Sequence, residues 1–336
     1  MLPRLDSRFV DYYNENLANR PGTHQVPLKE VRSSPGAFAR AWALNGDSAP
    51  DPNVREWRVP VAESSKPITV RTYYPDTSKW GLGPYPVHIN FHGGGWVFGD
   101  LGSDAAICLR LRERVPIVII DVEYRLCPEA RFGLNAQDAW SALKWTRDNA
   151  EKLDINPLSI SIGGISAGAH LACILQHRAR DEGISLRLLV ASVPPLADHH
   201  TYRVPEYSPW PSFTEFSKVP LLDWERMSYF QKHVFPDEGM AELQKMVPEW
   251  WISPLKAPNW TNLCSTFVAT AECDMLRDEG EAYAKRLVEG GNKVTMRRYL
   301  KVPHSFMHMH SVLPQARQYE DDVISALINA HGIKRE

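Results

Sequence analysis

Hydrophobic and polar positions along the chain follow two periods, and each period predicts a different kind of element. Two stretches at 57–61 and 68–73 alternate residue by residue and predict an antiparallel pair of strands at the edge of a sheet. The apolar runs at 87–91 and 117–120 predict strands that are buried on both faces. Further strands are predicted from residue 159 and at 188–191, 266–271 and 294–299, and helices at 105–114, 135–149, 167–180, 279–289 and 315–330.

Strand and helix therefore alternate along most of the chain, which predicts an α/β fold with a mostly parallel central sheet and helices on both faces. We expect this core in two parts, at 51–195 and 261–336. Residues 196–260 break the alternation and are rich in proline and aromatic side chains, which indicates a mainly helical cap insertion. Residues 1–50 are expected to form the N-terminal part of the cap. Their helical spacing lies in two groups: Phe9, Tyr12, Tyr13 and Leu17, then Phe38, Trp42 and Leu44.

Composition excludes several classes of protein. The chain has 336 residues, 43% of them hydrophobic, which is enough for a large core with an insertion. Because 38 basic and 40 acidic residues nearly cancel, neither a nucleic acid nor an anionic membrane is expected as a partner. The N-terminus lacks an apolar signal core, no run is long enough to span a bilayer, and five scattered cysteines fit reduced thiols. A cytoplasmic protein is expected.

One serine stands at the bend between the strand that begins at residue 159 and the next helix. It lies in the sequence Gly164-Ile165-Ser166-Ala167-Gly168. The glycines on either side have no Cβ, so a crowded turn can close and leave the hydroxyl of Ser166 facing out over the sheet, as a nucleophile requires. The competing interpretation is a glycine- and serine-rich turn in which Ser166 caps the helix.

A glycine-rich loop upstream favours the nucleophile. The apolar strand at 87–91 leads into His92-Gly93-Gly94-Gly95-Trp96, where consecutive glycines free backbone N–H groups to converge on one point. Loops of this sequence form the oxyanion hole of lipases and esterases. The two loops therefore stand in the order that acyl-transfer chemistry requires.

These two motifs resemble those of a known protein family, and three more stretches of the chain match the same family. They are residues 124–129 (Tyr-Arg-Leu-Cys-Pro-Glu), 274–279 (Asp-Met-Leu-Arg-Asp-Glu) and 304–306 (His-Ser-Phe). From about residue 85 to the C-terminus the sequence resembles the hormone-sensitive-lipase family, the bacterial family IV-like esterases of the α/β-hydrolase fold. The resemblance implies that fold and a serine carboxylesterase, and it leaves a homodimer open.

A serine hydroxyl needs a base to remove its proton, and an imidazole serves best when a carboxylate holds its other nitrogen. Asp274 follows the predicted strand at 266–271, and His304 follows the one at 294–299, both at the sheet edge where such folds place active sites. We therefore expect Ser166, Asp274 and His304 to be catalytic. Asp278 is the alternative acid, although its place at the start of a helix is typical of a capping residue.

His308 and His310 lie close to His304, and three histidines in one short span raise the question of a metal. The segment offers no cysteine or carboxylate ligand nearby, so His308 and His310 are interpreted as exposed or packing side chains. Neither a metal nor a cofactor is expected. The expected oxyanion donors are the backbone N–H groups of Gly93, Gly94 and Ala167. Four aromatic side chains are expected to line the substrate pocket: Trp96, Trp210, Phe213 and Phe216.

The expected function is hydrolysis of a small-molecule ester through an acyl-enzyme. A cap dense in aromatic side chains should close into a bounded apolar pocket, which favours short to medium acyl chains or compact aromatic esters. The alternatives are a natural-product tailoring esterase, deacetylase or lactone-forming enzyme on a polyketide-like substrate, and a non-catalytic small-molecule receptor. Ile165, Met275 and Ser305 depart from the family pattern, but none of them removes a catalytic group.

Overall fold

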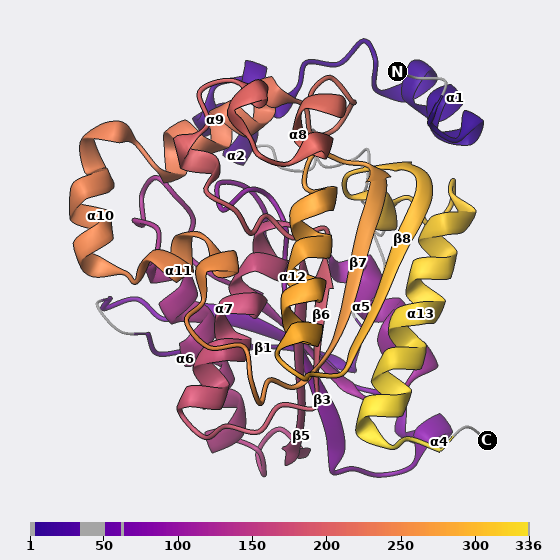
Figure 1. Ribbon diagram of the computed structural model, residues 1–336. Coiled ribbons are helices and arrows are strands. Elements are labelled where there is room, and N and C mark those ends of the chain that lie inside the picture. The colour runs from indigo at the N-terminus through magenta and orange to yellow at the C-terminus, as the bar shows by residue number, and fades with distance from the viewer. Residues whose placement is uncertain (1–3, 34–50, 62–63, 335–336) are drawn as a thin grey trace.

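An eight-stranded sheet runs through the centre of the computed structural model, which describes residues 4–33, 51–61 and 64–334 (Figure 1). The strands lie in the order β1-β2-β4-β3-β5-β6-β7-β8. Their bounds are β1 Val54–Val59, β2 Ile68–Tyr73, β3 Tyr85–Phe91, β4 Val118–Glu123, β5 Ile155–Ile165, β6 Leu188–Ser192, β7 Ser265–Cys273 and β8 Val294–Pro303. β2 pairs antiparallel with β1 and β4, and the other pairs are parallel. The predicted α/β fold with an antiparallel edge is confirmed.

Helices cover both faces of this sheet (Figure 1). α6, α7 and α12 pack on one face, and α5 and α13 pack on the other. The bounds of the core helices are α4 Thr77–Trp80, α5 Ala105–Arg114, α6 Leu134–Asp148, α7 Ala167–Asp181, α12 Arg277–Glu289 and α13 Pro314–His331, with a short 3-10 turn, η7 Phe306–His308. Almost every residue of β3, β4 and β6 is buried, because helices lie on each side. Within the described residues, no helix has the length and apolar character needed to cross a membrane.

The stretch between β6 and β7 leaves the sheet and folds across the carboxyl ends of the strands (Figure 1). Its elements are η3 His199–Thr201, η4 Pro205–Tyr207, α8 Pro211–Glu215, α9 Trp224–Val234, η5 Asp237–Gly239, α10 Met240–Met246, α11 Glu249–Ile252 and η6 Pro254–Lys256. The N-terminal elements are α1 Ser7–Asn16, η2 Thr23–Gln25 and α2 Leu28–Ser33. Arg226 in α9 donates to the hydroxyl of Thr23 at 2.6 Å, so the N-terminal segment contacts the cap.

The limits of the core and cap given above stay a prediction. The second predicted helical group of the N-terminal segment, Phe38, Trp42 and Leu44, lies outside the described residues. All five cysteines are free thiols, as the sequence predicted.

Two histidines share one buried serine between the sheet and α13. The Nδ1 of His88 lies 2.9 Å from the hydroxyl oxygen of Ser161, and the Nε2 of His331 lies 2.9 Å from the same oxygen. Ser159 contacts the other nitrogen of His331 at 2.8 Å. Burial lowers the pKa of His88 to about 3 and that of His331 to about 4. Both imidazoles are therefore neutral at ordinary pH, and they fix the end of α13 to the sheet.

We expect the free energy of unfolding to fall as the pH drops from about 6.5 towards 4. Unfolded histidines bind a proton near pH 6.5, whereas His88 does so only near pH 3 and His331 near pH 4, so the unfolded state binds more protons in this window. Urea unfolding followed at a series of pH values between neutral and acid measures the effect. His331→Gln removes one of the two groups and should lose less stability on acidification than the native chain. Equal losses in both proteins would contradict the assignment.

Candidate active site

Ser166 stands at the turn where β5 ends at Ile165 and α7 begins at Ala167. Its backbone has φ 55° and ψ −120°, a conformation that strains any residue with a side chain. The turn closes because its neighbours are glycines: a Cβ on Gly168 would lie 1.8 Å from the carbonyl oxygen of Phe91. The side chain of Ser166 makes no capping hydrogen bond to α7, which argues against the helix-cap interpretation.

Three side chains from the ends of three strands meet at this turn. The Nε2 of His304 lies 3.0 Å from the hydroxyl oxygen of Ser166, and its Nδ1 lies 2.7 Å from Oδ2 of Asp274. His304 is 6% exposed and Asp274 is 2% exposed, so little water competes for these contacts. Because a carboxylate only accepts hydrogen bonds, Nδ1 carries the proton and Nε2 presents its lone pair to the serine hydroxyl. The structure thus brings the three predicted side chains into one chain of hydrogen bonds.

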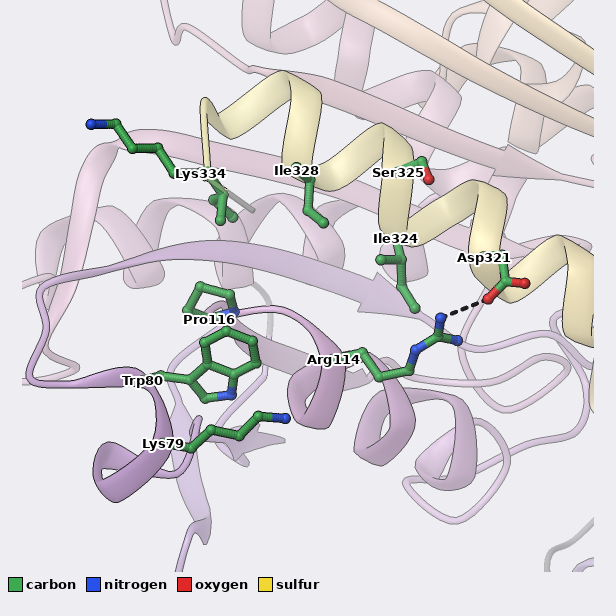
Figure 2. Close-up of a pocket in the computed structure, with 10 residues that line it drawn as sticks. Lys79, Trp80, Arg114, Pro116, Asp321, Ile324, Ser325, Ile328 and Lys334 are labelled. Atoms are coloured by element: carbon green, nitrogen blue, oxygen red, sulfur yellow. Dashed lines mark hydrogen bonds and ion pairs between the residues drawn. The ribbon is translucent and has the colours of Figure 1, made fainter. Parts of the chain in front are cut away.

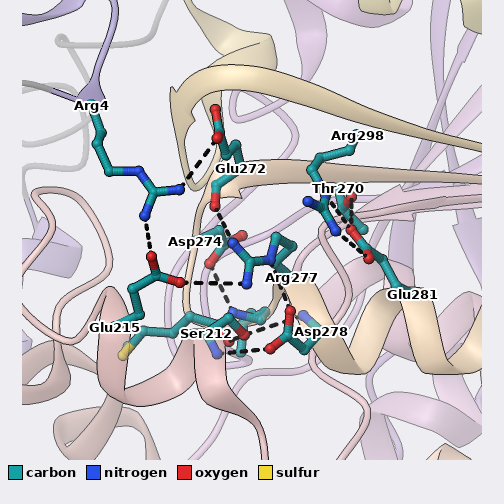
Figure 3. A network of polar contacts seen from close by, with 12 residues as sticks. Arg4, Ser212, Glu215, Thr270, Glu272, Asp274, Arg277, Asp278, Glu281 and Arg298 are labelled. Atoms are coloured by element: carbon teal, nitrogen blue, oxygen red, sulfur yellow. Dashed lines mark hydrogen bonds and ion pairs between the residues drawn. The ribbon is translucent and has the colours of Figure 1, made fainter.

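Asp278, the alternative acid, binds the cap instead (Figure 3). Its Oδ2 accepts from the backbone N–H of Ser212 at 2.7 Å, and its Oδ1 accepts from Nε of Arg277 at 2.8 Å. Burial would raise the pKa of Asp278, but the hydrogen bonds from Arg277 and Ser212 hold it below its ordinary value. Arg277 also lies 3.6 Å from the carboxylate of Glu215 in α8. Asp278 therefore helps to join α8 to α12.

The glycine loop after β3 lies beside Ser166. A Cβ on Gly93 would lie 3.6 Å from the Cβ of Ser166. Gly94 has φ 121°, and a Cβ there would lie 2.2 Å from the carbonyl oxygen of Phe98, so this position requires glycine. Among the described residues, no acceptor is found for the backbone N–H groups of Gly93, Gly94 and Ala167. Unpaired N–H groups on the loop and at the start of α7 can receive a developing negative charge.

Hydrogen bonds and ring stacking hold the glycine loop in place. The ring of His92 stacks on Tyr124 with centroids 4.3 Å apart, and the Tyr124 hydroxyl donates to the carbonyl of His92 at 2.7 Å. Burial lowers the pKa of His92, so the ring is neutral, and its Nδ1 donates to the carbonyl of Gly93 at 2.7 Å. Arg32 in α2 donates to the carbonyl of Val97 at 3.0 Å. The N-terminal segment thus helps to hold the loop.

Two of the aromatic residues predicted to line a pocket have other partners. Phe213 is 0% exposed and stacks on His199. Phe216 is 1% exposed, and the guanidinium groups of Arg4 and Arg277 each lie 5.1 Å from the centre of its ring. Both rings pack inside the cap or between the cap and the core. Their contacts do not support the expected role in lining a substrate pocket. The sequence alone does not distinguish an aromatic side chain that lines a pocket from one that packs in the interior.

The two tryptophans predicted for the pocket differ in burial. Trp96 is 5% exposed and packs edge-on against His170 and Phe132, with centroids 5.0 Å and 5.8 Å away. It therefore connects the glycine loop to α7 by packing. Trp210 precedes α8 and is half-buried.

Two aromatic side chains of α9 that the sequence pattern does not single out lie against the glycine loop. A Cβ on Gly95 would lie 2.5 Å from the ring of Phe230, so that ring rests on the loop backbone. Tyr229 stacks on Phe98 with centroids 5.9 Å apart and 7° between the ring planes. The aromatic density of this stretch is visible in the sequence, but the face of α9 that meets the loop is not.

Two surface cavities lie away from these residues. The larger, about 580 Å³, lies between α4 and the C-terminal half of α13 and includes Trp80 and Arg114 in its lining (Figure 2). The second, about 490 Å³, lies among α6, α7 and the segment around α11. Neither is lined by Ser166 or its two partners. The geometry of the side chains, rather than the size of a cavity, therefore locates the candidate site.

The histidines after His304 face separate carboxylates. His308 Nε2 lies 2.8 Å from Oδ1 of Asp104, and His310 Nε2 lies 3.7 Å from Oε2 of Glu320. Among the residues that the structure describes, no group of three histidine, cysteine or acidic side chains has the arrangement of a metal site. His308 is 14% exposed and paired with a buried acid, a polar partner that its interpretation as an exposed or packing side chain did not include.

Residues 88–308 match a protein family described by the alpha/beta hydrolase fold. The chain belongs to the α/β-hydrolase fold family. The match covers well over half of this hydrolase and includes the glycine loop, the Ser166 turn and His304. The resemblance to the hormone-sensitive-lipase-like esterases within this fold is confirmed.

Several relatives of this hydrolase are esterases. Ethyl acetate hydrolase of Pseudomonas putida is 28% identical over 90% of this chain and 91% of its own length. Versiconal hemiacetal acetate esterase of Dothistroma septosporum is 30% identical over 73% of each chain. Among solved structures, an esterase of Pyrobaculum calidifontis has a TM-score of 0.81 and 28% identity, and covers 97% of this chain and 98% of its own. The predicted enzyme class, a carboxylic-ester hydrolase, is confirmed.

Replacing the two candidate acids separately distinguishes their roles. Asp274→Asn should lower kcat by about 10³- to 10⁴-fold, because an amide cannot stabilise the imidazolium or hold the same tautomer. Asp278→Asn should leave kcat within about threefold of the native value and lower the thermal midpoint, because it weakens the contact with α8. Steady-state hydrolysis of p-nitrophenyl acetate and thermal unfolding measure both effects. The reverse ranking would transfer the role to Asp278.

Proposed function

We propose that the chain is a serine carboxylesterase that works through an acyl-enzyme, with Ser166, His304 and Asp274 as its catalytic residues. The observation that carries the proposal is the continuous hydrogen-bonded path from Asp274 through His304 to Ser166, at 2.7 and 3.0 Å. The unpaired N–H groups of the glycine loop and of Ala167 lie beside that serine. This is the arrangement that acyl transfer needs.

In the first half-reaction, Nε2 of His304 takes the proton of the Ser166 hydroxyl as its oxygen bonds to the ester carbonyl carbon. The negative charge moves to the carbonyl oxygen, where the N–H groups of Gly93, Gly94 and Ala167 receive it. The bond to the alcohol then breaks, and the alcohol leaves with the proton from His304. Asp274 stabilises the imidazolium during these steps.

In the second half-reaction, water attacks the acyl-enzyme and gives a proton to His304. The second tetrahedral intermediate collapses, the bond to Ser166 breaks, and the serine oxygen takes that proton back. A carboxylic acid leaves, and the site returns to its starting state. No cofactor or metal enters either step.

For the substrate we propose esters with a short to medium acyl chain or a compact aromatic group. Phe230 lies directly on the loop backbone at Gly95, and Tyr229 and Phe98 extend the same apolar surface. Such a surface beside the reacting carbonyl limits the length of chain that fits. Two of the relatives described above carry acetate in their names, which agrees with a small acyl group.

A second candidate is a natural-product tailoring esterase that removes an acetyl group from an aromatic polyketide-like substrate, or forms a lactone. The similarity to versiconal hemiacetal acetate esterase favours it, and so does the aromatic surface of Phe98, Tyr229 and Phe230. A non-catalytic receptor is disfavoured, because Ser166, His304 and Asp274 stand in hydrogen-bonding order. The homodimer that the sequence left open stays a prediction.

Ser166→Ala should abolish turnover while the fold is kept, because among the residues that the structure describes Ser166 supplies the hydroxyl that contacts Nε2 of His304. An organophosphate should label the native chain once, at Ser166, and should not label the variant. Mass spectrometry of the labelled peptide and circular dichroism of both proteins make the comparison. Turnover or labelling that persists in Ser166→Ala would refute the proposed nucleophile.

The native enzyme should prefer short to medium chains among p-nitrophenyl esters, and Phe230→Leu should raise kcat/KM for longer ones. Each extra methylene that the opened space admits should add roughly fourfold, since burying one is worth about 0.8 kcal/mol. Phe213→Leu is the matched control: it should cost stability but leave the chain-length profile unchanged, because Phe213 packs within the cap. Native rates that rise steadily to the longest chains, with activation at a lipid interface, would instead indicate an opening lid.

A further inference from the structure

A buried polar cluster joins the loop that carries His304 to the strand that leads into the glycine loop. We define the acid cluster as Asn90, Asp104, Asp121 and His308. The Nδ2 of Asn90 donates to Oδ2 of Asp104 at 3.1 Å and to Oδ1 of Asp121 at 2.9 Å. His308 Nε2 lies 2.8 Å from Oδ1 of Asp104. The cluster thus spans β3, β4, the start of α5 and the end of η7.

The side chains of the acid cluster differ in protonation, and this decides which of them donates a hydrogen bond and which accepts one. Burial, together with the nearby charge of Asp104, raises the pKa of Asp121 well above its ordinary value, so Asp121 is neutral. Burial acts on Asp104 in the same direction, but the hydrogen bonds from His308 and Asn90 hold its pKa below the ordinary value. A carboxylate only accepts, so Nε2 of His308 carries a proton. Asp104 therefore depends on these two donors, being 1% exposed.

The position of His308 in the chain makes this contact relevant to the site. His304 and His308 are joined by Ser305, whose φ is 59°, and by the single turn η7. The backbone N–H of His308 donates to the carbonyl of Ser305 at 3.2 Å. This turn is short and hydrogen-bonded, so fixing the side chain of His308 fixes the end of the loop from which His304 reaches Ser166.

At its other end the acid cluster holds β3. Asn90 precedes His92 by two residues, and the chain continues from the end of β3 directly through His92 into Gly93 and Gly94. The Asn90 amide is shared between two acids, so it ties the end of β3 to both β4 and the start of α5. One buried cluster therefore sets the place of the base and of the oxyanion donors together.

We propose that His308, acting through Asp104, is a positioning residue that fixes His304 relative to the glycine loop. The inference rests on the proposed function, since it concerns the alignment of that catalytic site. A misalignment of the base from the serine hydroxyl slows the chemical step far more than it weakens substrate binding. A role in stability alone would lower the unfolding midpoint and leave kcat unchanged.

Three variants separate these roles. His308→Leu removes the donor and keeps a side chain of apolar bulk, whereas His308→Gln places an amide N–H at a similar reach. His310→Leu is the matched control, because His310 is 30% exposed and stands 3.7 Å from Glu320. For each we would measure kcat and KM with p-nitrophenyl acetate, the second-order rate of organophosphate labelling at Ser166, and thermal unfolding.

In His308→Leu, kcat and the labelling rate should fall roughly tenfold or more, with KM within about twofold of the native value. His308→Gln should recover most of the loss, and His310→Leu should behave as the native enzyme. A folded His308→Leu with native kcat would overturn the proposal, and so would equal losses in the Leu and Gln variants.

Asp104→Asn keeps the test decisive if His308→Leu does not fold. Its amide would place an N–H against that of Asn90, so kcat should fall while His308→Gln stays near the native rate. Native kcat in Asp104→Asn would overturn the proposal.

Ser166→Ala, run in the same assays, separates a failure of the proposed function from a failure of the positioning role. If it abolishes labelling while the His308 variants keep native kcat, the proposed function stands and the positioning role fails, whereas turnover in Ser166→Ala refutes the function itself.

Discussion

The contact between the start of α7 and the end of β3 is the constraint on which the site depends. A Cβ on Gly168 would lie 1.8 Å from the carbonyl oxygen of Phe91, and one on Gly164, near the end of β5, would lie 2.4 Å from the same atom, so these backbones meet with no side chain between them. This approach places the start of α7 next to the glycine loop, where a Cβ on Gly93 would lie 3.6 Å from the Cβ of Ser166. The strained backbone of Ser166 has the same origin, because the chain must reverse within one residue.

The cap is attached to the core close to the candidate acid Asp274. At the start of α12, Asp278 accepts from the backbone of Ser212, and the next residue, Glu279, is fully buried and lies 2.8 Å from Nε2 of His199. Both contacts reach cap elements, and Asp274 lies only one turn earlier in the chain. The attachment of the cap and the candidate acid Asp274 therefore lie on one short stretch of chain.

The sequence predicts the alternating strands and helices of the core well, because the spacing of hydrophobic residues shows which faces of each element are buried. Helix α5 has the predicted bounds, and α13 differs by one residue at each end. The cap contacts were not predictable in the same way. Composition shows that 196–260 is aromatic, but only the fold decides that Phe213 turns inward while Phe230 meets the glycine loop. The pairing of His308 with Asp104 joins residues 204 apart in sequence, a distance at which local pattern carries no signal.

The three residues that depart from the family pattern, Ile165, Met275 and Ser305, show which positions are constrained by backbone conformation and which by the side chain. Ser305 adopts φ 59°, a backbone conformation that glycine takes without strain and that serine takes at some cost. The carbonyl of Met275 accepts from the Ser212 hydroxyl at 2.7 Å, a contact that any side chain there would permit. Ile165 is 3% exposed and fills apolar space next to Ser166. Each change leaves the main-chain path intact, and that path, together with three side chains, supplies every group the proposed reaction uses.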